Sequence, residues 1–415
     1  MKFAHLADCH IGSWREPKLR ELNLKAFKEA VDICIKENTA FVLIAGDLFD
    51  TSLPSIDIIK ETAAELEKLR SNDISVYIIP GSHDFSPSGK TILDVLEKAG
   101  LCENVVKIKY YENKIKLDFT LDKTNTKITG LFGKRRSLEK SYYDILDKKS
   151  LEEEKGFKIF MFHGSLDEYK PENLEAIESM SINQLPKNFD YYAGGHLHFV
   201  FNGARDGYRV IAYPGPLFPN SFLELEKLEH GNFYIVNFID EKISLKNIPI
   251  KLIDIISFNI DVNDKTAEEA EKEILKQIGK KDVKDKLVTL RISGVLSSGK
   301  PSDINFKEIM SKLKDAYFVL KNTNKLTTKE FEEIKVETGN VEEIESRIIK
   351  EHLGQIKIKD LDENKEEGLT YDLIQSLNIE KEDGERNIDF EDRLTKDLIK
   401  VFNLKKFWKN GTSEN

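Results

Sequence analysis

The sequence predicts an α/β protein in which two facing mixed β-sheets are flanked by helices, with a small α/β domain and a helical tail behind them. Two observations lead to this prediction. Residues 41–45 (FVLIA) form a short apolar run that ends at Gly46 and Asp47, as expected of a strand buried on both faces of a parallel sheet. Strand-like and helix-like segments alternate over residues 1–80, which is the rhythm of a sheet covered by helices.

The main domain is expected to span residues 1–250. Apolar residues at three- and four-residue spacing indicate amphipathic helices, whereas short apolar runs indicate strands. In chain order, strand, helix, strand, helix and strand are expected over residues 2–7, 19–34, 41–45, 55–70 and 75–80. Because the strands alternate with helices, we expect them to lie parallel in one sheet.

A second sheet is predicted from the chain that follows. Short alternating strands over residues 105–132 favour antiparallel pairs, and a charged helical stretch covers residues 138–155. Further strands are expected at KIFMF (158–162), DYYAGG (190–195), YRVIAY (208–213) and NFYIVNF (232–238). The last two of these are interpreted as closing strands of the second sheet.

Residues 251–325 are expected to form the small domain. Thr266 and Glu269 have capping-box spacing at the start of a helix over residues 267–278. Strands are expected at 258–262, 286–294 and 316–321, and a second helix at 306–313. This domain contains no histidine and no acids at ligand spacing, so we expect it to shape access to the first domain.

The tail, residues 326–415, is expected to be helical and polar. One helix is predicted from Asn340 to His352, and the charged stretch 359–368 resembles a flexible linker. Residues 368–379 and 389–404 each place apolar side chains on one face. These two short helices either dock a partner or pack on their own chain, and the sequence favours neither.

Composition restricts the class of protein. The 415 residues are 40% hydrophobic and 33% charged, and no apolar run approaches the roughly 20 residues of a membrane-spanning helix. Three widely spaced cysteines make a disulfide framework unlikely and favour an intracellular setting. A net charge of −10 argues mildly against a protein that coats nucleic acid electrostatically. A soluble intracellular protein is therefore expected.

Side chains suited to metal binding follow five of the predicted strands. They are Asp8 and His10, Asp47, Ser82 and His83, His163, and His196 and His198. Ligands of open α/β sheets bind beyond the carboxyl ends of the strands, where these side chains would meet. Imidazole and carboxylate together suit Mn, Fe or Zn better than Ca or Mg. The donors are too many for one ion, so two ions about 3.5–4 Å apart are expected, bridged by Asp47 on the central strand.

The spacing also suggests individual roles. Asp8 and His10 lie on one side of the chain because they are two residues apart, which turns Cys9 away from the site. His83 is best placed beside the ions, to stabilise the phosphate or protonate the leaving oxygen, with Asp84 orienting it. The sequence leaves open that His83 is itself a ligand.

The motifs DxH, GDxxD, GSHD, an isolated strand-end His and GHLH resemble the five signatures of calcineurin-like metallophosphoesterases. With the small cap domain and helical tail, the chain resembles more closely the archaeal Mre-eleven/SbcD-type nucleases of double-strand-break repair. The resemblance implies that Asp8, His10 and His198 bind one ion. It implies that His163 and His196 bind the other, that Asp47 bridges the two ions and that His83 is the catalytic histidine.

The resemblance also implies a function. It predicts Mn-dependent exonuclease and endonuclease action on DNA ends, single- or double-stranded, in a cytoplasmic, nucleoid-associated archaeal setting without a membrane. It further implies homodimerisation through the phosphoesterase domain, and a coiled-coil SMC-like ATPase that binds the C-terminal helices. Two alternatives remain at this point: a small-molecule or cyclic-nucleotide phosphodiesterase of the same superfamily, and a DNA-end-binding scaffold with weakened catalysis.

One departure from the family pattern bears on these alternatives. The family has Asn in the GNHD motif, where this chain has Ser82. An Asn carbonyl oxygen normally binds the second ion, whereas the shorter Ser hydroxyl is a poorer donor and reaches the ion only through water. Either the second site is weak, which reduces turnover or alters the metal preference, or a water fills the gap with little loss. We expect an active but slow enzyme.

Overall fold

The computed structural model describes residues 1–85, 89–134, 138–170, 178–329, 349–350, 353, 362–379 and 387–402. Most of the helix expected between Asn340 and His352 lies outside the described residues. Within the described part of the chain, none of the helices is long and apolar enough to cross a membrane.

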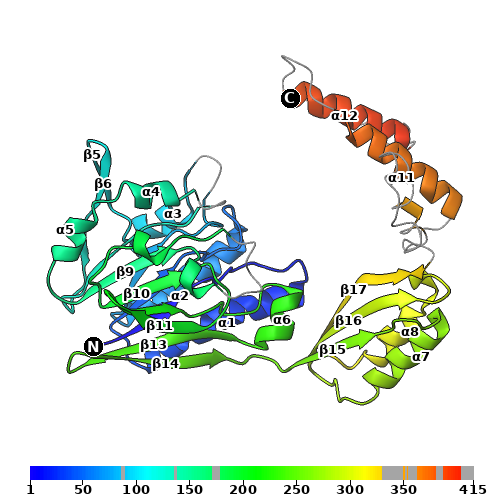
Figure 1. Cartoon of the computed structure of the whole chain (residues 1–415), viewed down its shortest axis with the longest axis horizontal. Coiled ribbons are helices and arrows are strands. Elements are labelled where there is room, and N and C mark those ends of the chain that lie inside the picture. Colours follow the sequence, from blue (N-terminus) through cyan, green and yellow to red (C-terminus); the bar gives the residue numbers. More distant parts are fainter. Residues whose placement is uncertain are drawn as a thin grey trace. The chain divides into compact units, whose positions relative to one another are not determined.

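The first sheet has the strand order β14-β13-β1-β2-β3-β4. Figure 1 shows its strands β13 and β14 side by side. Its strands are β1 (Lys2–Leu6), β2 (Phe41–Ala45), β3 (Ser75–Ile79), β4 (Glu103–Asn104), β13 (Gly231–Ile239) and β14 (Lys242–Ile250). As predicted, β1, β2 and β3 are parallel, and β4 continues the parallel series. The helices that the rhythm predicts are α1 (Pro17–Lys36) and α2 (Ile56–Ser71), and the short α3 (Leu93–Lys98) precedes β4.

The second sheet has the order β11-β12-β10-β9-β8-β7. Its strands are β7 (Thr120–Leu121), β8 (Lys127–Gly130), β9 (Lys158–His163), β10 (Tyr191–Gly195), β11 (Phe201–Arg205) and β12 (Tyr208–Tyr213). A separate hairpin joins β5 (Ile108–Tyr111) to β6 (Lys114–Leu117), and α4 (Lys140–Asp144) and α5 (Lys148–Glu153) replace the single charged helical stretch. Both sheets are mixed, so the predicted fold class is confirmed.

One strand assignment was wrong. NFYIVNF forms most of β13, which pairs antiparallel with β1 in the first sheet and does not close the second. The pairing joins residues more than 200 positions apart, such as Ala4 and Ile235, and a local apolar pattern carries no information about so distant a partner. YRVIAY does belong to the second sheet, where β12 lies parallel to β10.

Alternation along β2 explains how the two sheets are layered. Phe41, Leu43 and Ala45 belong to a buried cluster that also includes residues of β9 and β10, so this face of the first sheet packs on the second. Val42 and Ile44 point the other way, into a cluster shared with α1 and α2. Both faces of β2 are therefore buried, which is why its sequence is an uninterrupted apolar run.

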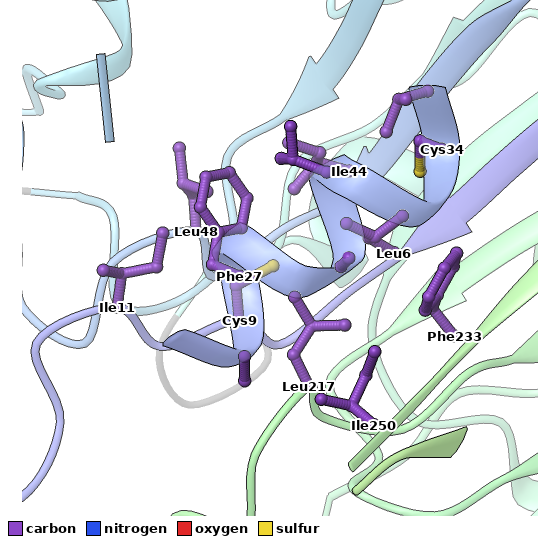
Figure 2. Packing of buried hydrophobic residues seen from close by; sticks show 14 of the residues in the cluster. Leu6, Cys9, Ile11, Phe27, Cys34, Ile44, Leu48, Leu217, Phe233 and Ile250 are labelled. Atoms are coloured by element: carbon purple, nitrogen blue, oxygen red, sulfur yellow. The ribbon is translucent and has the colours of Figure 1, made fainter. Parts of the chain in front are cut away.

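Cys9 belongs to the buried cluster between the first sheet and helices α1 and α2. Its side chain is buried among apolar residues such as Phe27 of α1 and Leu217 (Figure 2). Cys9 therefore turns away from the predicted metal site, as expected. Strand alternation is not the cause, because Asp8 and His10 lie beyond β1 and have positive φ. Cys34 and Cys102 are likewise buried, and all three cysteines are free.

The C-terminal part forms a three-stranded sheet, β15-β16-β17, with two helices. The elements are β15 (Ile255–Asp261), α7 (Ala267–Ile278), β16 (Leu287–Leu296), α8 (Phe306–Lys312) and β17 (Phe318–Thr328). The capping box at Thr266 and Glu269 is present in both directions.

Two helices of the tail are described, α11 (Glu363–Leu377) and α12 (Asn387–Val401), and they contact each other. The linker assignment was wrong for residues 363–368, because α11 begins at Glu363 behind an Asp362 cap. The chain divides into two compact units, one formed by residues 1–257, 283–289 and 316–320 and the other by the remainder. The three-part division at residues 250 and 325 stays a prediction.

Candidate metal centre

The candidate site lies where strand ends of the two sheets approach each other. His163, the last residue of β9 in the second sheet, places its Nδ1 atom 2.9 Å from the carbonyl oxygen of Ala45, the last residue of β2 in the first. The approach leaves no room for a side chain at Gly46, where a Cβ atom would lie 2.2 Å from His163 Nδ1 and φ is +89°. Glycine is therefore required between the central strand and Asp47.

The backbone at the strand ends adopts an uncommon conformation. Asp8, His10, Asp47 and His196 all have positive φ, between 42° and 91°. Non-glycine residues rarely occupy this region, and such strain concentrates at functional sites, where surrounding contacts hold it. These four residues lie just after β1, β2 and β10, so the strained backbone is concentrated beyond the ends of these strands.

Asp47 occupies the middle of this centre. Its Oδ2 atom lies 3.2 Å from His163 Nε2 and 3.7 Å from His10 Nε2. The backbone N–H of His83 donates to Oδ1 at 2.7 Å, which fixes the carboxylate from the β3 side. Asp47 therefore faces predicted ligands from both sheets, as a bridging carboxylate must.

A second group forms around Asp8. The Nε2 atoms of His10 and His198 lie 3.2 Å apart, and His198 Nε2 is 3.9 Å from Asp8 Oδ1. Both Asp8 oxygens accept from the backbone N–H of His196, at 2.8 and 3.0 Å. Asp8, His10 and His198 were the predicted ligands of one ion, and the structure brings these three together.

The positions of the donor atoms in the structure indicate, independently of the sequence motifs, that this centre can bind a metal. Three groups in the described chain have donor atoms within 4.8 Å of one another: Asp8, His10 and His198; Asp8, Asp47 and His163; and His10, Asp50 and His83. Moreover, His10 Nδ1 and His163 Nε2 are buried without a hydrogen-bond partner. Buried polar nitrogens normally find a partner. A cation held by His163 Nε2 and the nearby Asp47 carboxylate would supply one.

His196 takes part differently. Its backbone holds Asp8, and its ring lies 5.2 Å from the ring of His163, but it belongs to none of the three groups. Burial and the neighbouring His163 lower the pKa of His196 to about 4, so its ring is neutral, the form in which histidine binds a metal. Its assignment as a ligand stays a prediction.

The acids and imidazoles of the centre strongly affect each other's charge. Burial alone would lower the pKa of His163, but the facing carboxylate of Asp47 raises it to about 10. Burial would likewise raise the pKa of Asp47, yet the charges of His163, His10 and His83 hold it well below its usual range. Acids and imidazoles thus balance one another here, and cations binding in place of the imidazole protons would retain that balance.

The residues that follow β3 are also placed at the centre. Ser82 is buried and its hydroxyl lies 3.4 Å from Asp47 Oδ2. The ring of His83 packs edge-on against His10 at 4.7 Å, and its Nδ1 atom lies 2.7 Å from the carbonyl oxygen of Asp50. Both positions agree with a role beside the ions, and both assignments stay predictions.

Asp84 has a different environment from the one expected. Its carboxylate accepts from the backbone N–H groups of Gly81 (2.8 Å) and Phe49 (3.2 Å), and so joins the turn after β2 to the turn after β3. Burial and the nearby charge of Asp47 raise its pKa to about 7. No hydrogen bond between Asp84 and His83 occurs among the described residues, where the carbonyl of Asp50 contacts His83 instead. The proposed catalytic role of Asp84 therefore has no supporting contact.

Two acids that the sequence interpretation did not single out also reach the site. Asp50 Oδ1 lies 3.3 Å from His10 Nδ1, and Glu224 Oε1 lies 3.1 Å from His198 Nδ1. Asp50 ends the GDxxD motif, which could have identified it. Glu224 stands three residues after Ser221 at capping-box spacing, but nothing in that pattern connects it with His198.

Comparison with known proteins agrees with this geometry. Residues 1–200 match the model of the calcineurin-like phosphoesterase family. The DNA double-strand break repair protein Mre11 of Archaeoglobus fulgidus is 26% identical, over 99% of this chain and 98% of that protein. The protein of the same name from Thermoplasma acidophilum is 31% identical over 71% of this chain and 77% of that protein, and the one from Methanococcus maripaludis is 29% identical over 52% and 56%.

The resemblance seen in the five strand-end motifs is therefore confirmed. The relative from Thermoplasma acidophilum combines substantial identity with coverage of most of its length, and the match to the relative from Archaeoglobus fulgidus extends into the C-terminal part. The chain belongs to the archaeal Mre11 family of DNA double-strand break repair proteins and is a phosphoesterase of the calcineurin-like type.

Proposed function

We propose that the chain is a two-metal nuclease that processes the ends of DNA double-strand breaks. The observation that carries the proposal is the pair of donor groups that share Asp8: Asp8, His10 and His198, and Asp8, Asp47 and His163. The names of the archaeal relatives point to DNA repair as the setting of this chemistry.

In this proposal Asp8, His10 and His198 hold one divalent ion, and His163 and His196 hold the other, with Asp47 between them. Bound ions would supply a nucleophilic water at neutral pH and neutralise charge on the attacked phosphodiester. Manganese suits the mixture of imidazole and carboxylate donors. The buried, hydrogen-bonded positions of Asp8 and Asp47 keep the carboxylates fixed, so that little rearrangement is needed when ions bind.

His83 acts on the substrate itself. Its Nδ1 atom faces the carbonyl oxygen of Asp50 at 2.7 Å, so Nδ1 carries the proton and Nε2 is left for the substrate. From that position the ring can donate a proton to the leaving oxygen once it is protonated, or stabilise the phosphate charge.

The partners of the enzyme also follow from the family. We propose DNA ends as the substrate, a coiled-coil SMC-like ATPase bound to α11 and α12, and a homodimer formed through the phosphoesterase domain. Leu53 and Ile56 support the homodimer, because these apolar side chains, in the loop before α2 and at its first residue, are 80% and 83% exposed. Light scattering of Ile56→Glu should give the mass of one chain where the parent gives that of two.

The proposal is tested by the metal content of the protein together with Mn²⁺-dependent digestion of linear DNA. The parent should bind two ions per chain and degrade DNA, and His83→Ala should retain the ions but lose at least about 100-fold in rate, the usual share of a general acid. Equal degradation by parent and His83→Ala would reject the catalytic assignment.

One alternative is favoured by a specific feature. Ser82 leaves the second site without the usual amide ligand, so the chain could be a DNA-end-binding scaffold with weakened catalysis. That alternative predicts full DNA binding with at most one ion per chain. A small-molecule phosphodiesterase, in contrast, would hydrolyse a chromogenic diester and leave DNA intact.

A further inference from the structure

Three histidines of the centre share one feature of orientation. In each ring Nδ1 lies within 3.3 Å of an oxygen that belongs to neither Asp8 nor Asp47, and Nε2 lies 3.2–3.9 Å from one of these two carboxylates. For His163 the oxygen is the carbonyl of Ala45 at 2.9 Å, for His10 the carboxylate of Asp50 at 3.3 Å, and for His198 the carboxylate of Glu224 at 3.1 Å. An oxygen that accepts the Nδ1–H fixes the tautomer and leaves the Nε2 lone pair for a cation, as at His163 and His198. At His10 the approach to Asp50 is an ion-pair distance without a hydrogen bond.

The three rings differ in how far the surrounding structure holds them. The side chains of His10 and His163 are 4% and 0% exposed, whereas that of His198 is 25% exposed. His198 follows β10 at the outer edge of the centre, so burial constrains it least. Its orientation therefore depends most on its contact with Glu224.

Glu224 is itself held in place. Its Oε2 atom accepts from the backbone N–H of Asn220 at 2.8 Å, and Oε1 accepts from the Ser221 hydroxyl at 3.0 Å. The Ser221 hydroxyl in turn accepts from the Glu224 N–H and caps α6 (Phe222–Leu228). The carboxylate thus has a single position, fixed by the start of α6, from which it reaches His198.

The same segment is joined to the loop that carries the DxH motif. The Ser13 hydroxyl donates to the Asn220 side-chain oxygen at 2.9 Å, and the Trp14 indole N–H donates to the Pro219 carbonyl at 3.0 Å. The segment holding Glu224 is therefore fixed relative to Asp8 and His10, the other two members of the same donor group.

We propose that Glu224 is a positioning residue that orients His198 and thereby sets the affinity of the ion held by Asp8, His10 and His198. The inference rests on the proposed two-metal function and names a determinant of the same site. Outer carboxylates of this kind typically change metal affinity 10- to 100-fold when removed. Glu224 has no place among the donor groups themselves, so its effect must pass through His198.

The test is a titration of the metal-free full chain with Mn²⁺, with free Mn²⁺ followed by electron paramagnetic resonance. Glu224→Ala should weaken one of the two ions about 10- to 100-fold and leave the other within about threefold. Glu224→Gln, which keeps an oxygen facing Nδ1, should restore most of that affinity. Lys227→Ala, an exposed change on the same helix, is the matched control and should bind both ions as the parent does.

A double-mutant cycle separates positioning from a general loss of structure. In a His198→Ala background, adding Glu224→Ala should change Mn²⁺ affinity less than twofold, because the ring through which Glu224 acts is absent. A full additional loss in that background would overturn the inference. Equal binding of both ions by parent and Glu224→Ala would overturn it while leaving the two-metal function intact, whereas failure of the parent to bind any ion would overturn both.

Discussion

At the scale of single residues, the strand-end pattern predicted which side chains meet at the centre but not which residues contact and orient them. Asp8, His10, Asp47, His163 and His198 could be predicted to come together because each lies at or just after the end of a strand, where ligands of α/β sheets bind. That two sheets contribute these strand ends became clear only from the structure. Asp50 and Glu224 contact the same histidines through the folded chain, and Asp84 turned out to join two backbone turns. Such contacts depend on where side chains point once distant strands have paired. The sequence pattern contains no information about those directions.

Ser82 gives the first prediction at this scale. Its hydroxyl lies 3.4 Å from Asp47 Oδ2, at the place where the family's Asn would offer a carbonyl oxygen. Ser82→Asn should bind the second ion about 10-fold more tightly, because an amide oxygen is a stronger ligand than a hydroxyl. Mn²⁺ titration measures this, with Ser82→Ala as control. Unchanged binding in Ser82→Asn would show that residue 82 lies outside the metal's reach.

His5 gives a prediction about pH. The ring is fully buried in β1, its Nδ1 atom lies 2.8 Å from the Tyr191 hydroxyl, and burial lowers its pKa from 6.5 to about 3. The unfolded chain therefore takes up this proton near pH 6.5 and the folded chain only near pH 3, so stability falls as the pH drops between these values. By pH 4.5 the loss attributable to His5 should reach about 2–3 kcal/mol.

Urea unfolding at pH 7 and pH 4.5 tests this assignment. His5→Gln cannot titrate, so its deficit in the free energy of unfolding relative to the parent should shrink by about 2–3 kcal/mol on acidification. A deficit that is the same at both pH values would mean that other buried groups cause the acid sensitivity.

At the scale of elements, the apolar pattern best predicted those helices and strands that bury one face or both faces. The amphipathic α1 and α2 and the fully buried β2 follow the predicted periodicity. The short β4 and β7, two residues each, have no period to recognise. β13 was recognised as a strand but placed in the wrong sheet, since its pairing with β1 is decided by tertiary structure.

The capping box of α7 gives a prediction at this scale. The Thr266 hydroxyl accepts from the Glu269 N–H at 3.2 Å, and the Glu269 carboxylate accepts from the Thr266 N–H at 2.9 Å. Thr266→Ala should lower the free energy of unfolding of the C-terminal unit by about 1 kcal/mol, because a terminal N–H group loses its acceptor. Thr266→Ser keeps the acceptor, so it should lower the free energy of unfolding by only about a few tenths of a kcal/mol. Denaturant unfolding checks both variants, and equal stability of Thr266→Ala and the parent would contradict the prediction. DNA digestion should be unchanged in both.

At the scale of the whole molecule, composition predicted less than the motifs did. A net charge of −10 gives no sign of a DNA-processing protein, whereas five strand ends with metal donors led to the correct family. The division into three domains at residues 250 and 325 stays a prediction. The structure divides the chain into two compact units, and residues 283–289 and 316–320 belong to the first of them.

The tail gives the prediction that concerns assembly. Leu377 at the end of α11 and Phe402 after α12 are 56% and 45% exposed, although both continue the apolar positions of their helices. If the helix pair docks the ATPase partner, these side chains are available for the contact without unfolding the pair. Leu377→Glu and Phe402→Glu should each weaken binding at least about 10-fold, since a carboxylate would be buried without a partner.

The measurement is binding of the full chain to the purified coiled-coil region of the ATPase by calorimetry. Gln375→Glu, an exposed polar position on α11, adds the same charge and is the control. Circular dichroism should show unchanged helix content, because none of the three side chains is buried within the pair. Truncation after residue 361 removes both helices and should abolish binding. Retained binding after truncation would place the docking surface elsewhere, and α11 and α12 would then serve their own chain.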